Sequence, residues 1–260
     1  MVTDPKTIPA AFEAGINFFF LSGDLHWPHY EASRRGLAML LSKRGVRDRI
    51  VVAVVSYVTQ PAFCHIPFIE VLDALPALKR IDLSIIGGTH GYEFLVRLDE
   101  YRHHRSGARF PATRALGATF HDRRAAAYAT AHGLVDIAYC RYNPLHRGAE
   151  VDLFPFVATR PRTLLYNFKS ADGHLPVKRL RTLGLSKGYW HPGITDYYRF
   201  ALTRPELDGL LCSPSTPKEV HGLVRALESG PLSEEESRYL CDVADLDQGK
   251  ARLARSTASP

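Results

Sequence analysis

The sequence predicts an α/β fold and, within that class, a (β/α)8 barrel of the TIM type. Two observations support this prediction. Short apolar runs recur along the 260-residue chain, and their nearly continuous apolar character is typical of parallel strands buried on both faces. Amphipathic stretches separate these runs, and their apolar residues recur three and four positions apart, as in helices that cover such a sheet.

Seven strands are expected, one on each apolar run. They lie at residues 16–22, 50–56, 81–87, 115–120, 135–140, 163–168 and 207–212. Helices are expected where the amphipathic period holds, at residues 5–14, 30–43, 67–78, 92–104, 123–132 and 217–227. The segment 169–192 is polar and basic and contains glycine, which is typical of a mobile loop over the mouth of a barrel.

The first strand of an eight-stranded barrel is missing, because the chain opens with the helix at 5–14. The expected barrel is therefore incomplete, is closed by something else, or begins upstream of this start. A missing strand leaves two strand edges open, which a second subunit would cover, so a homo-oligomer is one expectation. The barrel domain is expected to span residues 1–246, and residues 247–260 are expected to form a flexible polar tail.

Composition and charge exclude several classes of protein. A hydrophobic fraction of 45% is too high for a disordered chain, and the apolar runs are too short to span a membrane or to form a secretory signal. Lys and Arg exceed Asp and Glu by 33 to 27, but the basic residues are spread along the chain without a nucleic-acid motif. The four cysteines lie far apart, which argues against a disulfide framework or a zinc ribbon. A cytoplasmic protein is expected, with neither nucleic acid nor membrane as a partner, and the preference for Arg over Lys is typical of a GC-rich bacterial genome.

Several short motifs stand in a specific order. They are AFEAGINF at residues 11–18, RD at 47–48, IDL at 81–83, RYNP at 141–144 and DGLLCSPSTPKEV at 208–220. Each motif is weak alone, but their order and spacing resemble those of the aldo-keto reductases from about residue 8 to residue 240. The resemblance implies a (β/α)8 barrel that reduces carbonyls with NADPH. It also implies a catalytic tetrad of Asp, Tyr, Lys and His at the carboxyl ends of the strands.

The tetrad positions that the resemblance implies carry other residues. Phe20 stands at the Asp position, Val55 or the following serine at the Lys position, and Gly87 or the following glycine at the His position. Tyr30 is the only phenol within reach of the Tyr position. In the family mechanism the charged Lys and Asp tune the acidity of the Tyr, and neither Phe nor Val provides that charge. A degenerate tetrad without hydride transfer is therefore expected.

The cofactor positions are altered in part. The Ser-Asn pair that holds the nicotinamide amide in the family is replaced by Thr119 and Phe120, and a Gln is replaced by Tyr139. Ser213 and Lys218 match family positions that bind the adenosine phosphate. On this comparison NADPH binding is doubtful but not excluded.

Histidines gather where the barrel mouth is expected. Eight of the twelve follow an expected strand or lie in its loop: His26, His29, His65, His90, His121, His146, His174 and His191. The strongest local pattern is Asp24-x-His26-x-x-His29-Tyr30, whose Asp and His are ligand types of a divalent metal such as zinc or non-haem iron. The alternative assigns His26, His29 and His121 to general acid/base catalysis, with Tyr30 or Tyr57 as hydrogen-bond donors.

Basic residues follow the same strands. Lys169 comes directly after the strand at 163–168 and is a candidate for Schiff-base formation, or else an ordinary charged loop residue. Four arginines in these loops would bind a carboxylate or phosphate, or pair with surface carboxylates: Arg123, Arg124, Arg141 and Arg147.

Three functions remain open from the sequence. The leading hypothesis is an enzyme that acts on a small organic substrate by histidine-based, non-redox chemistry such as dehydration, isomerisation or cyclisation, with or without a metal. The first alternative is a divergent NADPH-dependent carbonyl reductase in which Tyr30 or a histidine donates the proton. The second is a non-catalytic barrel that binds a ligand or a partner.

Overall fold

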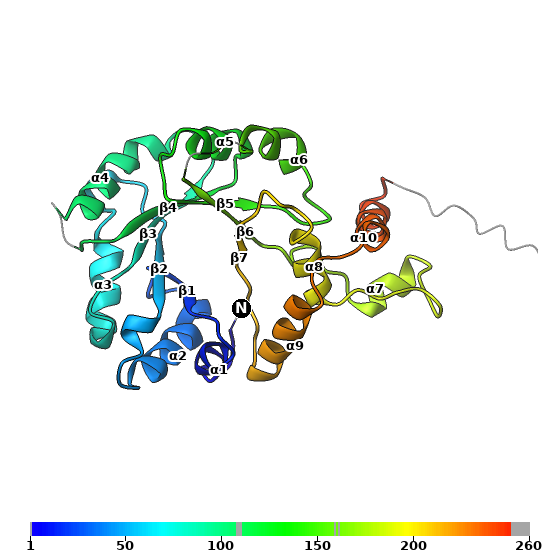
Figure 1. The fold of residues 1–260 in the computed structure, drawn as a ribbon, viewed down its shortest axis with the longest axis horizontal. Coiled ribbons are helices and arrows are strands. Elements are labelled where there is room, and N and C mark those ends of the chain that lie inside the picture. The colour runs from blue at the N-terminus through cyan, green and yellow to red at the C-terminus, as the bar shows by residue number, and fades with distance from the viewer. Residues whose placement is uncertain (1, 108–110, 159, 161, 251–260) are drawn as a thin grey trace, which may run out of the picture.

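The expected strands pair into one parallel sheet whose spatial order follows the chain, β1 to β7 (Figure 1). This computed structural model describes residues 2–107, 111–158, 160 and 162–250. The strands are β1 (Phe18–Ser22), β2 (Val51–Ser56), β3 (Leu83–Thr89), β4 (Ala115–Phe120), β5 (Ile137–Arg141), β6 (Leu164–Phe168) and β7 (Gly209–Leu210). The first six lie within about two residues of their predicted bounds, whereas β7 is two residues long instead of six.

Alternate residues of each strand face opposite sides of the curled sheet. In β2, Val52 and Val54 belong to the large core between sheet and helices, whereas Ala53 and Val55 belong to a second cluster inside the barrel. Both sides are therefore apolar, which is why the strands are continuous apolar runs in the sequence. The interior cluster matters for function because its upper residues form the floor of the barrel mouth.

Helices cover the outer face of the sheet (Figure 1). The helices of the described residues are α1 (Thr7–Glu13), α2 (Glu31–Leu41), α3 (Ile66–Ala74), α4 (Phe94–Ser106), α5 (Arg123–Ala131), α6 (Ala149–Asp152), α7 (Val177–Thr182), α8 (Ile194–Ala201), α9 (Pro217–Glu228) and α10 (Glu234–Asp247). Local sequence starts several of them. Asp122 caps α5, Thr216 caps α9, and Ser233 with Glu236 forms a capping box at α10. No described helix is long and apolar enough to cross a membrane.

The side of the barrel without the eighth strand lies between β1 and β7. Within the described part of the chain, β1 pairs with β2 and β7 pairs with β6, so each has one unpaired edge. The N-terminal segment reaches across this side: the backbone N–H groups of Thr3 and Asp4 donate to the carbonyl of Ser215 at 3.2 and 3.1 Å. Helix α1 packs on α2 and α9. The helical layer is thus continuous where the sheet is not.

The opposite end of the barrel, at the amino ends of the strands, repeats one stabilising device. An aspartate that precedes a strand accepts a hydrogen bond from a backbone N–H of the neighbouring strand. The carboxylates of Asp82, Asp136 and Asp208 accept from the amides of Val52, Leu116 and Leu165, at 2.9, 2.8 and 2.7 Å. Each aspartate also pairs with an arginine: Arg47, Arg105 and Arg160. This end of the barrel is therefore built for stability rather than for binding.

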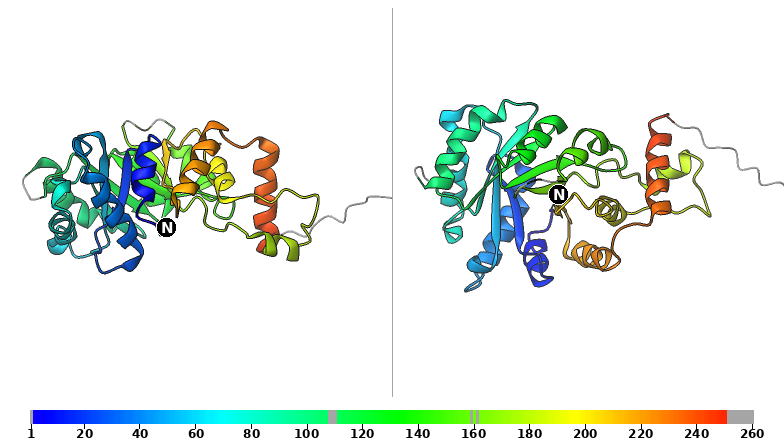
Figure 2. Two further views of the ribbon diagram at one scale, coloured as in Figure 1. Left: turned by 90° about the horizontal axis from the view of Figure 1, so that it is seen from below. Right: turned by 45° about the horizontal axis from the view of Figure 1, so that its top comes forward.

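The segment after β6 differs from the expected mobile loop. It contains α7, and Leu180 and Leu185 pack against Val243 of α10 in a small separate core. Figure 2 shows this segment and α10 together at one end of the molecule. Helix α10 runs to Asp247, so the predicted tail begins inside a helix, and residues 251–260 lie outside the described part of the chain.

Candidate functional site

The carboxyl ends of the parallel strands meet at one end of the barrel, where sites of such barrels are built from the following loops. Val55 belongs to the interior cluster below this mouth, and Phe20 packs against that cluster. At Gly87 a Cβ atom would lie 2.7 Å from both Tyr57 Cδ1 and Val55 Cγ2, and 2.8 Å from the carbonyl oxygen of Ser56. The Tyr57 ring therefore occupies the space that any side chain at position 87 would need.

Two phenols predicted as donors come together at this mouth. Tyr57, directly after β2, makes a side-chain hydrogen bond with Tyr30, at the start of α2. Trp27 contacts both rings, with centroids 5.6 Å from Tyr30 and 6.2 Å from Tyr57. The guanidinium of Arg97 donates to the carbonyl of Gly87 at 3.0 Å and to that of Val58 at 3.2 Å, so the backbone on both sides of the phenol pair is fixed.

Both phenols stay protonated at neutral pH. Partial burial, then the charge of Tyr30 and then the hydrogen bond to Tyr30, raise the pKa of Tyr57 to about 12. Burial also raises the pKa of Tyr30, while the hydrogen bond from Tyr57 acts in the opposite direction. The hydrogen bond between the two hydroxyls thus lowers the pKa of Tyr30 and raises that of Tyr57, so it favours loss of the proton from Tyr30 over loss from Tyr57.

The predicted metal ligands do not come together. Asp24, His26 and His29 are exposed, and a carboxylate oxygen of Asp24 accepts from the backbone N–H of His26 at 3.0 Å in a local turn. The ring of His29 lies against Trp27, with centroids 5.8 Å apart. Among the described residues, no three His, Cys, Asp or Glu side chains form a group able to hold a metal ion. A short sequence spacing in a loop does not set ligand geometry, which is why the pattern misleads.

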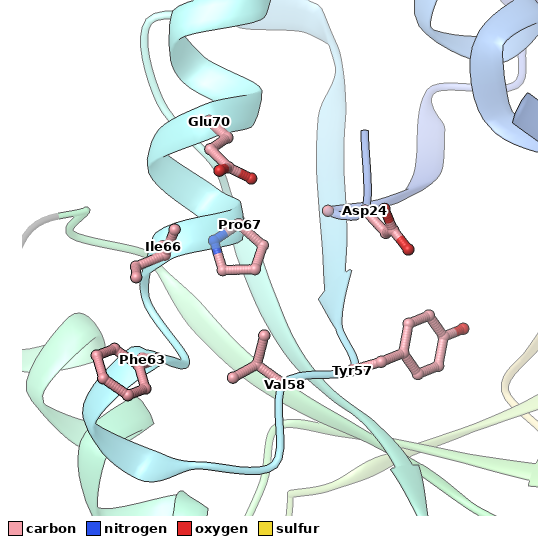
Figure 3. A pocket seen from close by; sticks show the side chains of 8 residues that line it. Asp24, Tyr57, Val58, Phe63, Ile66, Pro67 and Glu70 are labelled. Carbon is pink, nitrogen blue, oxygen red and sulfur yellow. The ribbon is translucent and has the colours of Figure 1, made fainter. Parts of the chain in front are cut away.

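A pocket of about 390 Å³ lies beside the phenol pair, between the loops after β1 and β2 and the start of α3 (Figure 3). Its lining residues are Gly23, Asp24, Tyr57, Val58, Phe63, Ile66, Pro67 and Glu70. The lining is apolar apart from the Tyr57 phenol and two exposed carboxylates. The pocket therefore offers space for an organic ligand next to the phenols.

Two imidazoles stack on the next strands of the mouth. His90 follows β3 and His121 follows β4, and their rings lie 4.8 Å apart and nearly parallel at 11°. The backbone N–H of His121 donates to the carbonyl of Thr89 at 2.8 Å, and Phe168 contacts the His121 ring edge-on at 5.6 Å. Burial lowers the pKa of His121, and the neighbouring charges of His90, Lys169 and Arg141 lower it further. His121 is therefore a neutral imidazole at neutral pH.

Cationic groups continue around the mouth on β5 and β6. Arg141 ends β5, and its guanidinium lies 3.9 Å from the Asp172 carboxylate. Lys169 has φ of 56°, in the left-handed region, and its carbonyl accepts from the side-chain amide of Asn143 at 2.9 Å. Burial lowers the pKa of His146, and Arg141 lowers it further.

A second pocket, of about 370 Å³, adjoins this group. It is lined by His121, Asp122, Arg123, Arg124 and Asp152. Three of its charges are already satisfied, because Arg123 pairs with Asp152 at 2.7 Å and the Asp122 carboxylate caps α5. Of the remaining arginines named in the sequence, Arg147 is also committed, through a two-pronged pair with Asp245 at 2.8 and 2.9 Å.

The two predicted cofactor residues follow β7. Ser213 and Lys218 are exposed and flank the start of the 12-residue helix α9. The Ser213 backbone N–H donates to the Tyr198 hydroxyl at 3.2 Å. Tyr139 lies in the barrel interior, and its buried hydroxyl has no hydrogen-bond partner among the described residues.

Sequence reasoning missed Arg97 and the pairing of His90 with His121. Arg97 stands on the apolar face of its helix, three residues after Phe94 and four before Tyr101. A charged residue at that spacing is a detectable signal of a buried, committed side chain. The stacking of the histidines depends on the register that pairs the end of β3 with the end of β4, which sequence periodicity does not give.

The sequence matches no protein-family model and no curated protein. The fold, however, matches solved structures over nearly the whole chain. An aldo-keto reductase from Bacillus halodurans in its holo form has a TM-score of 0.72 at 16% identity, covering 96% of this chain and 89% of that one. An aldo/keto reductase from Klebsiella pneumoniae, in complex with NADP and acetate, has a TM-score of 0.68 at 17% identity, with 96% and 88% covered. A glycerol dehydrogenase from Gluconobacter oxydans has a TM-score of 0.64 at 15% identity, with 98% and 88% covered. The chain therefore has the barrel fold of the aldo-keto reductases.

Proposed function

We propose that the protein is a divergent carbonyl reductase in which Tyr30, supported by Tyr57, donates the proton. The observation that carries this proposal is the hydrogen-bonded phenol pair at the barrel mouth, seated over Phe20, Val55 and Gly87. Similar solved structures support it, because one of them is an aldo/keto reductase in complex with NADP. Of the functions left open by the sequence, the proposal favours the NADPH-dependent carbonyl reductase over the enzyme with histidine-based, non-redox chemistry.

The residues present suit NADPH at two points. Ser213 and Lys218 offer an exposed hydroxyl and an exposed ammonium at the start of α9, where the helix dipole also favours phosphate. The buried Tyr139 hydroxyl lacks a partner among the described residues, and it would bind the nicotinamide amide. When bound, NADPH supplies the hydride.

The proton route follows from the two phenols. Reduction of a carbonyl gives an oxygen that needs one proton, and the Tyr30 hydroxyl provides it, because the hydrogen bond with Tyr57 lowers the pKa of Tyr30 but raises that of Tyr57. The negative charge then left on Tyr30 is stabilised by that same hydrogen bond. A phenol with a raised pKa is fully protonated at neutral pH, so Tyr30 carries the proton that it donates. Proton donation of this kind contributes roughly 10²- to 10⁴-fold to a rate.

A second candidate function rests on His121. Its pKa is lowered, so this imidazole, which lines the second pocket, is neutral and would act as a general base in non-redox chemistry. This function needs no nucleotide, which makes it separable from the first by experiment.

The test is a fluorescence titration with NADPH, followed by NADPH oxidation with a panel of small aldehydes and ketones. Tyr30→Phe is expected to lower kcat at least about a hundredfold with little change in NADPH affinity, and Tyr57→Phe to lower it less. Tyr189→Phe is the matched control, because this exposed tyrosine lies before α8, far along the chain from the phenol pair. A protein that does not bind NADPH, or a Tyr30→Phe variant with full activity, would refute the proposal.

A further inference from the structure

We infer that the groups around Arg141 and Lys169 bind an anionic oxygen group of the substrate, so that the substrate is a small organic acid or phosphate ester that also carries a carbonyl. The inference rests on the proposed function for the reaction, but anion binding itself is measured without it. The relevant set, called the anion cluster below, is His90, His121, Arg141, His146 and Lys169.

The sheet brings the anion cluster to one side of the mouth. The register pairs Thr89 with Phe120 and Arg141 with Phe168, so the residues that follow these positions lie at similar heights. Direct contacts agree with this placement: the His90 and His121 rings stack at 4.8 Å, and Phe168, which precedes Lys169, touches His121. Four neighbouring strands therefore supply the cluster.

The charge of the cluster is poorly neutralised. Arg141 has one acidic partner, Asp172, at the long distance of 3.9 Å, and within the described ranges Lys169 has no ion-pair partner. The other nearby carboxylates are committed, since Asp152 binds Arg123 and Asp122 caps a helix. The lowered pKa of His121 fits this excess of positive charge. A carboxylate or phosphate would meet one guanidinium, one ammonium and imidazole N–H donors.

The backbone at Lys169 is held in a conformation that disfavours lysine. Lys169 and Lys79 are the two non-glycine residues with positive φ among the described residues, and Lys79 lies at the other end of the barrel, before β3. The side-chain amide of Asn143 holds the Lys169 carbonyl at 2.9 Å, and that of Asn167 donates to Ser170 at 2.8 Å. A strained residue that its neighbours hold in place is a common feature of functional sites.

The cluster adjoins the phenol pair along the mouth. Tyr57 packs on β3 at Gly87 and Gly88, and a Cβ at Gly88 would lie 3.4 Å from the Tyr57 ring. His90, the first residue of the cluster, directly follows this strand. A substrate with a carbonyl at the phenols and an acid group at the cluster therefore lies along one side of the mouth.

The experiment measures anion binding to the nucleotide-free protein by calorimetry at low ionic strength. The probes are succinate and inorganic phosphate, and NADP is titrated separately. Lys169→Met is expected to weaken binding of succinate or phosphate roughly tenfold to a hundredfold, while Lys169→Arg keeps most of it. Lys178→Met is the matched control, because this exposed lysine lies in α7.

The outcomes separate the two proposals. Binding of either small anion that is lost in Lys169→Met but not in the control supports the anion cluster, even if no carbonyl is reduced. Absence of succinate and phosphate binding, or equal weakening in both Met variants, overturns it. Weakened NADP binding with unchanged binding of both small anions also overturns it, because the cluster would then serve the nucleotide's phosphates.

Discussion

Replacing Asp82 with alanine removes the most buried of the three carboxylates at the amino ends of the strands. Its side chain is 4% exposed, and it binds Arg47 at 2.7 Å and the backbone N–H of Val52 at 2.9 Å. It also accepts from Arg80 at 3.3 Å. The variant leaves the buried Arg47 guanidinium without its counter-charge and one strand N–H without its acceptor.

The loss of unfolding free energy depends on the hydrogen bonds that Arg47 keeps in the variant. Removing one partner of a buried ion pair costs about 3–5 kcal/mol. Arg47 keeps three carbonyl acceptors, those of Leu78, Ile50 and Arg80, at 2.6, 3.0 and 2.9 Å. We therefore expect the lower end, a loss of about 3 kcal/mol of unfolding free energy, or about 6–12 °C in Tm for a chain of this size.

Urea denaturation measures the loss, and Asp48→Ala is the control. Asp48 also pairs with Arg80, at 3.2 Å, but its side chain is 79% exposed, so its removal should cost less than about 1 kcal/mol. Equal losses in the two variants would show that burial does not determine the cost here. A loss of less than about 1 kcal/mol in Asp82→Ala would refute the assignment of this end of the barrel to stability.

Two further predictions concern the mouth. Gly87→Ala should lower the unfolding free energy, measured by urea denaturation, by roughly 1–3 kcal/mol and should also impair catalysis, because the new Cβ displaces Tyr57. Gly222→Ala is the control: it lies at an open helical position, so it should be neutral or stabilising. Wild-type activity in Gly87→Ala would contradict this. The unfolding free energy should fall as the pH drops through the range just below 6.5. In that range His121 and His146 bind protons more readily in the unfolded chain than in the folded protein, because folding lowers the pKa of both. His121→Asn should flatten that slope across a pH series, and an unchanged slope would count against the lowered pKa.

Periodicity alone predicts most of the fold, because strands buried on both faces leave a strong sequence pattern. The run 115–120 coincides with β4, whereas the run 207–212 yields a two-residue strand. β7 pairs with β6 alone, so few partners fix its length. Helix α8 is absent from the expected helices although Ile194–Ala201 is amphipathic, because eight residues are too few for the helical period to stand out in the sequence.

The candidate site is harder to predict, because it depends on which loops meet. Tyr30 and Tyr57 are predicted as donors from their positions after strands, and the structure places them in contact. His26 and His29 have the same kind of position but turn outward, because the Asp24 turn and the ring of Trp27 hold this loop. Sequence spacing gives the strand that a residue follows, and not the direction of its side chain.

The contact of the N-terminal segment with Ser215 has a consequence for the order of folding. Among the described strands, every sheet pairing is parallel and joins strands that are consecutive in the chain, so the sheet can grow by one strand–helix–strand unit at a time. The bonds from Thr3 and Asp4 to Ser215, and the packing of α1 on α9, instead join segments more than two hundred residues apart. Because closing so long a loop has an entropic cost, we expect this contact between the N-terminal segment and the α9 region to form last and to open first. Amide exchange in α1 should accordingly be faster than in the central strands.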